Sequence, residues 1–405
     1  MGNTIKALAD SFSVVILTGA RQVGKSTLLR MLEPDTAYYT FDSLLESESA
    51  QIDPVGYVRT RSTPAIIDEV QYVPELFRAI KLVVDEAKFA GSRQTLFFVT
   101  GSQRLHMMRG ASESLAGRAY ALELLGLSQR EMERVDFYEP FAPTVGYLKR
   151  RRNAGHVPGC DTLWQRILRG DMPELAAVEH LDTQLFYESY LSTYIRRDVR
   201  DLSQVGDLTL FNRFITVAAS MCGQQLNKAA LSRDLGISQP TITRWLTILE
   251  ASGIIFFLPP FYKNIRKRLV KTPKLYFTNT GLVCYLQGIH SAESLANSSA
   301  SGHLFENYVI LEIIKSHLNA TGRYPELYFY RDADGKEIDL LISTPAGIHP
   351  LEIKATTAPR GKDTNRFVMV EDVLSEKRLE GALISRCDQV LPAGDNNLMI
   401  PATLI

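Results

Sequence analysis

The sequence Gly19-Ala20-Arg21-Gln22-Val23-Gly24-Lys25-Ser26 fits the pattern G-x-x-x-x-G-K-[ST] at every fixed position. An apolar run precedes it at residues 14–17, and residues 27–32 have the composition of a helix. In such a strand–loop–helix unit, glycines let successive backbone N–H groups turn toward phosphate oxygens, and the helix N-terminus adds partial positive charge. The sequence therefore predicts an ATP site whose phosphate-binding residues are Gly19, Ala20, Arg21, Gln22, Val23, Gly24, Lys25, Ser26 and Thr27.

Composition limits the class of protein. The chain has 405 residues, of which 45% are hydrophobic and 22% charged, and its formal net charge is zero. This length predicts more than one domain, and the neutral charge means that any nucleic-acid contact must come from local basic patches. The cysteines are scattered without a C-x-x-C pair, which disfavours a zinc site and favours a reducing, cytoplasmic location. No apolar run is long enough to cross a bilayer, so we expect no membrane contact.

The first 135 residues predict an α/β domain. Five apolar stretches alternate with helical patterns, at residues 13–18, 37–42, 64–69, 95–100 and 119–125. Alternating strands and helices are typical of a doubly wound parallel sheet, in which ligands bind at the carboxyl ends of the strands.

Polar residues near the ends of these stretches supply the rest of the predicted ATP site. Lys25 is expected to reach the β- and γ-phosphates, and Ser26 and Asp68 to hold Mg²⁺. Glu69 follows Asp68 directly and could orient and deprotonate the attacking water.

Three further residues are weaker candidates for the same site. Thr100 and Ser102 could sense the γ-phosphate, or they could belong to an ordinary polar turn. Arg118 is the candidate arginine for the charge that develops on the γ-phosphoryl group, acting within one subunit or across an interface. An ordinary surface arginine is the alternative for Arg118.

Residues 136–206 predict a helical linker region. The segment 135–159 is rich in proline, glycine and aromatic residues, and it includes Lys149-Arg150-Arg151-Arg152. Such a basic run usually forms a solvated face, with phosphate contact as the alternative.

Residues 207–262 predict a winged helix-turn-helix. Gly236 suits the tight turn between two helices, Ser238 can cap the second helix, and Pro240 fits its first turn. On that second helix, the expected packing face comprises Ile242, Trp245, Leu246 and Leu249, and the expected groove-reading face comprises Thr243, Arg244 and Thr247.

A basic cluster follows this motif, from Lys263 to Lys274, with no acidic residue within it. Clustered cations beside aromatic residues are typical of a surface that follows nucleic-acid phosphates. We therefore expect DNA contacts through Arg244, Lys263, Arg266, Lys267 and Arg268. A protein–protein module and a lysine-protected strand edge are the alternatives.

Residues 263–405 predict an α/β domain of the nuclease type. Glu306 lies in a helical segment at 302–317, Asp339 in an apolar strand, and Glu352 and Lys354 on the next strand, projecting to one side. Metal-dependent phosphodiester cleavage requires this set: Asp339 and Glu352 would bind Mg²⁺, Glu306 could complete the shell, and Lys354 would position water. On its own, however, the pattern Glu-x-Lys also occurs on many solvent-exposed strands.

These motifs together resemble a family of AAA+-like ATPases that is widespread in bacteria and archaea. The resemblance is carried by the phosphate loop, Ile-Ile-Asp-Glu-Val-Gln at 66–71, Thr-Gly-Ser at 100–102, and Leu-Ala-Gly-Arg at 115–118. Pro-Lys-Leu-Tyr-Phe at 273–277, Phe-Glu-Asn at 305–307, and the Asp339 and Glu352 strands resemble the family's C-terminal half, long catalogued as uncharacterised. The resemblance implies an ATPase joined to a winged helix and a restriction-endonuclease-like domain of the PD-(D/E)XK type, and assembly into homo-oligomers. Asn279 stands where the family usually has aspartate, and Ile338 replaces the proline of the nuclease motif.

Two functional hypotheses follow. In the first, ATP hydrolysis is coupled to DNA binding or remodelling, and metal-dependent cleavage is an open question. In the second, the chain is a nucleotide-gated regulatory or protein-interaction ATPase whose nuclease-like fold is an inert scaffold.

Overall fold

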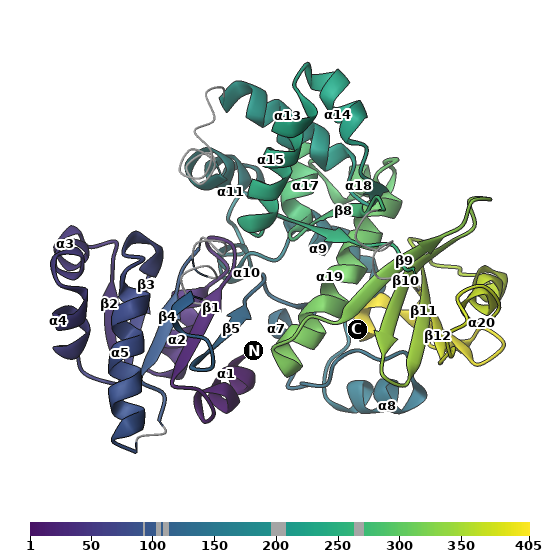
Figure 1. Cartoon of the computed structure of the whole chain (residues 1–405). Coiled ribbons are helices and arrows are strands. Elements are labelled where there is room, and N and C mark those ends of the chain that lie inside the picture. Colours follow the sequence, from purple (N-terminus) through teal and green to yellow (C-terminus); the bar gives the residue numbers. More distant parts are fainter. Residues whose placement is uncertain (92–93, 103–106, 108–112, 196–207, 263–270) are drawn as a thin grey trace. The chain divides into compact units, whose positions relative to one another are not determined.

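A computed structural model describes residues 1–91, 94–102, 107, 113–195, 208–262 and 271–405 (Figure 1). The chain divides into two compact units. Unit 1 comprises Met1–Gly126 with Leu249–Gly253 and Leu318–Arg323, and unit 2 comprises Leu127–Ile248, Ile254–His317 and Tyr324–Ile405. Among the residues described, no helix is long and apolar enough to cross a membrane.

Unit 1 is built on a parallel sheet in the order β2-β3-β4-β1-β5. Its strands are β1 Val14–Thr18, β2 Ala37–Thr40, β3 Ala65–Asp68, β4 Phe97–Thr100 and β5 Ala119–Glu123. Each lies inside one of the five predicted stretches, so the predicted α/β fold of this unit is confirmed. Strands β1, β3 and β4 are buried along their whole length, as expected when both faces of a parallel sheet are covered.

Helices cover both faces of this sheet. They are α1 Gly2–Ala9, α2 Lys25–Leu32, α3 Leu44–Ile52, α4 Pro54–Arg59 and α5 Leu76–Phe89, with the short 3₁₀ helix η1 Val70–Tyr72. Val14 and Ile16 of β1 share one core cluster with Phe77 and Ile80 of α5. Because side chains alternate along a strand, Val15 and Leu17 point to the opposite face, and both are fully buried.

The segment predicted as a winged helix-turn-helix forms, with the strand that follows it, three helices and three short strands in unit 2. The elements run in the order α13 Leu208–Ser220, β6 Gln224–Gln225, α14 Lys228–Leu235, α15 Gln239–Ala251, β7 Ile255–Leu258 and β8 Lys274–Phe277. The end of α15, from Leu249, is the exception, because it is assigned to unit 1. The three strands form an antiparallel sheet in the order β6-β8-β7. Strand β8 pairs with β7 along its whole length, so the predicted boundary at residue 262 lies between two strands of one sheet.

A second sheet in unit 2 follows the long helix α19 Ser301–Thr321, whose last turn is assigned to unit 1. Its order is β13-β14-β12-β11-β10-β9, and β9, β10 and β11 form an antiparallel meander. The strands are β9 Glu326–Arg331, β10 Glu337–Thr344, β11 Gly347–Lys354, β12 Gly381–Ser385, β13 Leu391–Pro392 and β14 Asn397–Pro401. After β11, the chain passes through η4 Gly361–Val368 and α20 Met369–Asp372 before β12 pairs in parallel with β11.

The remaining helices of unit 2 connect or cover these parts. They are α7 Gln129–Met132, α8 Val145–Asn153, η2 Cys160–Thr162, α9 Leu163–Arg169, α10 Pro173–Ala177, α11 Thr183–Tyr190, η3 Leu191–Ile195, α17 Thr280–Leu286, α18 Ala292–Ala296 and η5 Ala402–Leu404. The helices α7 to α11 therefore belong to the same compact unit as the C-terminal strands.

Candidate functional site

The predicted phosphate loop joins β1 to α2, and its glycines set its shape. Gly19 has φ 145°, and a Cβ there would collide with the carbonyl oxygen of Leu124. Gly24 has φ 91° directly before Lys25, the first residue of α2. Both positions lie in the left-handed region, which glycine adopts without strain. The two fixed glycines of the motif are therefore required by the backbone.

The Lys25 ammonium lies buried over this loop. Its Nζ donates to the carbonyl oxygen of Gly19 at 3.1 Å and to that of Ala20 at 2.8 Å. The helix N-terminus at the same place favours anions through its partial positive charge. A fixed cation, a left-handed glycine loop and a helix N-terminus together fit the phosphate groups of a nucleotide.

Asp68 brings together the groups that fit Mg²⁺. Ser26 Oγ donates to Asp68 Oδ1 at 2.9 Å, Tyr38 donates to Asp68 Oδ2 at 2.5 Å, and the Thr100 hydroxyl donates to Asp68 Oδ1. Burial, and then the contact with Asp68, raises the pKa of Tyr38. A hydroxyl and a carboxylate in contact are the protein donors that hold Mg²⁺ in P-loop sites, so Ser26 and Asp68 fit that ion.

Tyr38 was not among the predicted site residues, although its position on β2 follows from strand alternation. Thr40 pairs with Asp68 and Tyr38 with Ile66 across β2 and β3. Because residues two apart on a strand share a face, Tyr38 and Asp68 project to the same side of the sheet. Only the strand order makes the two strands neighbours.

Glu69 is held by a residue that the sequence analysis did not select. Glu69 has φ 57°, which is uncommon for a residue other than glycine and places it in a sharp turn after β3. The buried side-chain amide of Gln71 donates to the Glu69 carboxylate and, at 3.4 Å, contacts Ser102 Oγ. This amide therefore connects the ends of β3 and β4, where the predicted base and γ-phosphate sensor lie.

Arg118 lies at the other edge of the sheet. Ala119 pairs with Val14, the first residue of β1, whereas the phosphate loop follows the last one. Five residues of β1 at about 3.3 Å each separate the two edges by about 16 Å. Arg118 instead forms an ion pair with Asp85 of α5 at 2.5 Å. The ATP-site role of Arg118, within one subunit or across an interface, therefore stays a prediction.

Helix α15 has one buried face and one exposed face. Ile242, Trp245 and Leu249 are buried, whereas Thr243, Arg244 and Thr247 are exposed. Lys263, Arg266, Lys267 and Arg268 lie outside the described residues, in the connection from β7 to β8. The earlier run at 149–152 offers less basic surface than its sequence indicates, because Arg151 is fully buried and Arg150 pairs with Glu139 at 2.7 Å.

Asp339, near the start of β10, lies close to Lys354 at the end of β11, which also contacts Glu352. Lys354 Nζ lies 2.6 Å from Glu352 Oε1 and 3.7 Å from Asp339 Oδ2. Asp339 Oδ2 also accepts from the backbone N–H of Ile353 at 2.8 Å. Burial, and then the Asp339 charge, raises the pKa of Glu352 to about 7.

An unpredicted lysine occupies this cluster. Lys274 of β8 is buried, and its Nζ lies 2.9 Å from Glu306 Oε1 and 2.5 Å from Glu337 Oε1. Tyr276 donates to Glu306 at 2.5 Å. Although the Lys274 ammonium lies next to Glu306, burial keeps the pKa of that carboxyl above its usual range.

This lysine changes two expectations. Lys274 does not belong to the basic surface, because its ammonium is turned into the carboxylates. Within the described ranges, no three His, Cys, Asp or Glu side chains are arranged to hold a metal ion. The metal set predicted at Glu306, Asp339 and Glu352 is therefore not assembled in this conformation, since an ammonium neutralises Glu306.

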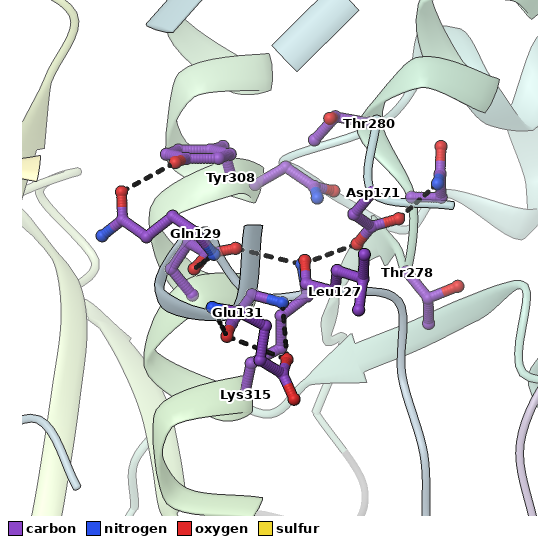
Figure 2. Close-up of polar contacts among 12 residues, drawn as sticks. Leu127, Gln129, Glu131, Asp171, Thr278, Thr280, Tyr308 and Lys315 are labelled. Carbon is purple, nitrogen blue, oxygen red and sulfur yellow. Dashed lines mark hydrogen bonds and ion pairs between the residues drawn. The ribbon is translucent and has the colours of Figure 1, made fainter. Parts of the chain in front are cut away.

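A second buried cation organises the start of unit 2 (Figure 2). Lys315 of α19 contacts Asp171 Oδ2 at 2.6 Å, Glu312 Oε1 at 3.0 Å and the Leu127 carbonyl oxygen at 3.0 Å. The Gln129 backbone N–H donates to Glu312 Oε2 at 2.8 Å. The two carboxylates outweigh the effect of burial and raise the pKa of Lys315. This network fixes the chain at Leu127–Gln129 against α19.

Asn279 joins the same network. Its side-chain oxygen caps α17 by accepting from the Leu282 N–H at 2.8 Å and from Tyr187 at 2.8 Å, and its amide donates to Asp171. An aspartate at this position would face the Asp171 carboxylate. The departure of Asn279 from the family pattern therefore has a local electrostatic reason.

Three family models match successive parts of the chain. Residues 11–133 match a model described as AAA domain, residues 160–293 match Domain of unknown function (DUF8612), and residues 301–405 match Domain of unknown function (DUF4143). The first model coincides with the parallel sheet and phosphate loop. Unit 1 is therefore an ATPase domain of the AAA/P-loop type.

Relatives cover nearly the whole chain. The uncharacterized proteins Mb2031c of Mycobacterium bovis and Rv2008c of Mycobacterium tuberculosis are each 29% identical over 394 residues, which cover 97% of this chain and 80% of theirs. The Walker-type ATPase PABY2304 of Pyrococcus abyssi is 14% identical, with a TM-score of 0.43, and the match covers 71% of this chain and 94% of that one. The branch migration motor RuvB of Thermotoga maritima is 15% identical, with a TM-score of 0.30, over 64% of this chain and 89% of its own.

Proposed function

We propose that ATP turnover in unit 1 is coupled to DNA binding by the winged helix-turn-helix of unit 2. In the ATP site, the loop N–H groups and Lys25 bind the phosphates, Ser26 and Asp68 hold Mg²⁺, and Glu69 orients the attacking water. Mg²⁺ would supply charge neutralisation for the γ-phosphoryl group. Gln71 holds Glu69 through its side-chain amide.

One observation carries the DNA part of this proposal. The order α13–β6–α14–α15–β7–β8, with the sheet order β6-β8-β7, presents a helix that is buried on one side and exposes Arg244 and two threonines on the other. A helix-turn-helix places the exposed face of its second helix in the major groove. The four basic residues from Lys263 to Arg268 lie in the connection between the last two strands, where a wing would contact the phosphates.

Salt-dependent DNA binding tests this part. Removing one cation that neutralises a phosphate should reduce the slope of log K against log salt by about 0.9. Alanine at Lys263, Arg266, Lys267 and Arg268 together should therefore lower the slope by about 3 to 4. A double variant, Lys149→Ala with Arg152→Ala, removes two exposed cations elsewhere in unit 2 and should leave the slope unchanged. Equal slopes for all three proteins would refute DNA binding by this surface.

The ATPase part has its own test. Lys25→Ala removes the ammonium that lies over the phosphate loop, so ATP turnover should fall to background. Glu69→Gln should retain ATP binding but lose turnover, because the carboxylate that activates water is gone. Unchanged turnover in Lys25→Ala would contradict the assignment of the site.

The inert-scaffold hypothesis is favoured by a different observation, the ammonium of Lys274 among the C-terminal carboxylates. The nuclease hypothesis is supported by the element order α19, antiparallel β9–β11, a short helix and the parallel strand β12, with Asp339 on β10 and with Glu352 and Lys354 on β11. Purified protein incubated with duplex, branched and single-stranded DNA, with Mg²⁺ or Mn²⁺ and with or without ATP, distinguishes the two. Cleavage that Asp339→Asn abolishes supports a nuclease, and binding without cleavage supports the scaffold.

A further inference from the structure

The buried carboxylate of Asp68 is held by hydroxyl groups. Asp68 is 5% exposed, and its Oδ1 accepts from Ser26 Oγ at 2.9 Å and from the Thr100 hydroxyl. Its Oδ2 accepts from the Tyr38 hydroxyl at 2.5 Å. Within the described ranges, no lysine or arginine forms an ion pair with Asp68. A buried carboxylate requires a positive charge close by, so this one fits a bound cation.

The two oxygens of this carboxylate are held differently. Ser26 and Thr100 both donate to Oδ1, whereas Tyr38 donates to Oδ2. The terminal torsion of an aspartate side chain is broad, so a carboxylate that is held at one oxygen can still rotate. A donor on the other oxygen prevents this rotation. The Tyr38 hydroxyl therefore fixes the direction in which the Asp68 carboxylate presents Oδ1 to Ser26.

The ring of Tyr38 also contacts the helix that follows the phosphate loop. Arg30 of α2 lies over this ring, with its guanidinium carbon 5.1 Å from the ring centroid. A cation over an aromatic face is attracted by the ring. Lys25 and Ser26 are the first two residues of the same helix. Tyr38 thus contacts α2 through its ring and Asp68 of β3 through its hydroxyl, and it connects the two elements that carry Ser26 and Asp68.

We infer that Tyr38 is a positioning residue of the ATP site, which orients the Asp68 carboxylate for the divalent cation that accompanies the nucleotide. Tyr38 acts on the cation through Asp68 and not by direct contact. Removing a partner that orients a metal ligand typically lowers metal affinity by about 10–100-fold. The inference rests on the proposed Mg²⁺ role of Ser26 and Asp68, and it does not depend on DNA binding.

Nucleotide affinity with and without the cation tests this inference in the full-length protein. The dissociation constant of a fluorescent, non-hydrolysable ATP analogue is measured in excess Mg²⁺ and in EDTA, and the ratio of the two values gives the contribution of the cation. Tyr38→Phe removes the hydroxyl and keeps the ring for Arg30. It should leave the value in EDTA unchanged and weaken binding in Mg²⁺ about tenfold. Adding Thr100→Val removes a donor from the other oxygen and should bring the ratio close to that of Asp68→Ala.

Tyr39→Phe is the matched control. Tyr39 is the next residue of β2 and pairs with Ile67, so its side chain projects to the opposite face of the sheet, and both dissociation constants should stay unchanged. A Tyr38→Phe protein with the wild-type ratio would overturn the inference. A larger ratio would also overturn it, because the hydroxyl would then occupy the place of the cation, and so would weaker binding in EDTA, which indicates general damage.

Failure of the proposed ATP site gives a different result in the same experiment. If wild-type protein binds the analogue equally well in Mg²⁺ and in EDTA, the cation site at Ser26 and Asp68 is refuted, and the inference with it. If wild-type affinity depends on Mg²⁺ and Tyr38→Phe does not change that dependence, only the role of Tyr38 is refuted.

Discussion

Replacing Lys315 by methionine should destabilise unit 2 strongly. The substitution removes the cation that contacts Asp171, Glu312 and the Leu127 carbonyl (Figure 2) and leaves two buried carboxylates without an opposite charge at this position. Removing one partner of a buried ion pair costs about 3–5 kcal/mol of unfolding free energy. A second argument limits the loss of unfolding free energy, because the folded variant can protonate one of these carboxylates instead of burying its charge. At pH 7 this protonation costs about 4 kcal/mol for an ordinary glutamic acid with pKa near 4.3.

The same reasoning fixes the pH dependence of this loss. In the variant, protonation of an uncompensated carboxyl removes its buried charge, so the loss of stability relative to wild type is largest at neutral pH and smaller at low pH. At pH 5, protonating that carboxyl costs only about 1 kcal/mol, so the deficit relative to wild type should shrink to about that value. Adding Glu312→Gln and Asp171→Asn to Lys315→Met removes both charges, and the triple variant should recover most of the lost stability.

Urea denaturation followed by tryptophan fluorescence measures this effect. The chain has two tryptophans, Trp164 and Trp245, and both belong to unit 2, so the signal reports that unit. Lys149→Met on α8 changes an exposed lysine to the same residue and should cost less than about 0.5 kcal/mol. A loss below about 1 kcal/mol for Lys315→Met at pH 7, or a triple variant as unstable as the single one, would refute the reasoning.

Three other variants test single contacts. Gln71→Ala removes the amide that holds Glu69, so kcat for ATP should fall about tenfold with KM nearly unchanged, as steady-state kinetics would show. Burial lowers the pKa of His317 to about 4 from 6.5, so unit 2 should lose at most about 3 kcal/mol as pH falls from 6.5 to 4; His317→Gln should flatten this dependence in urea titrations. Asn279→Asp places a carboxylate against Asp171 and should cost about 1–3 kcal/mol at pH 7 in the same assay.

Matched controls separate these effects from general damage. His290→Gln and Asn365→Asp change exposed residues of unit 2 and should leave both stability and its pH dependence nearly unchanged. For Gln71→Ala, a fall in ATP affinity with unchanged kcat would contradict the positioning role. A His317→Gln profile as steep as wild type, or an Asn279→Asp variant as stable as wild type, would show that the assigned contact does not control stability.

The sequence alone determined the phosphate loop and the strands of unit 1. Loop geometry at Gly19 and Gly24 is a local property, because two left-handed residues beside a strand and a helix need few distant neighbours. Apolar runs likewise mark β1 to β5 because both faces of a parallel sheet are buried. The buried face of α15 and the side-by-side placement of Glu352 and Lys354 follow from local periodicity in the same way.

Only the tertiary structure decided which charges meet. Lys274 and Lys315 look like ordinary lysines in the sequence, yet each is buried against carboxylates that are distant along the chain. Arg118 directly follows Gly117 and was therefore a candidate catalytic arginine from the sequence. The strand register nevertheless places it at the edge of the sheet where β1 begins, away from the phosphate loop. Local sequence patterns indicate which face of a helix or strand is apolar. The partner of a buried ion is chosen by strand order and helix packing, which bring together residues that no short window of sequence contains.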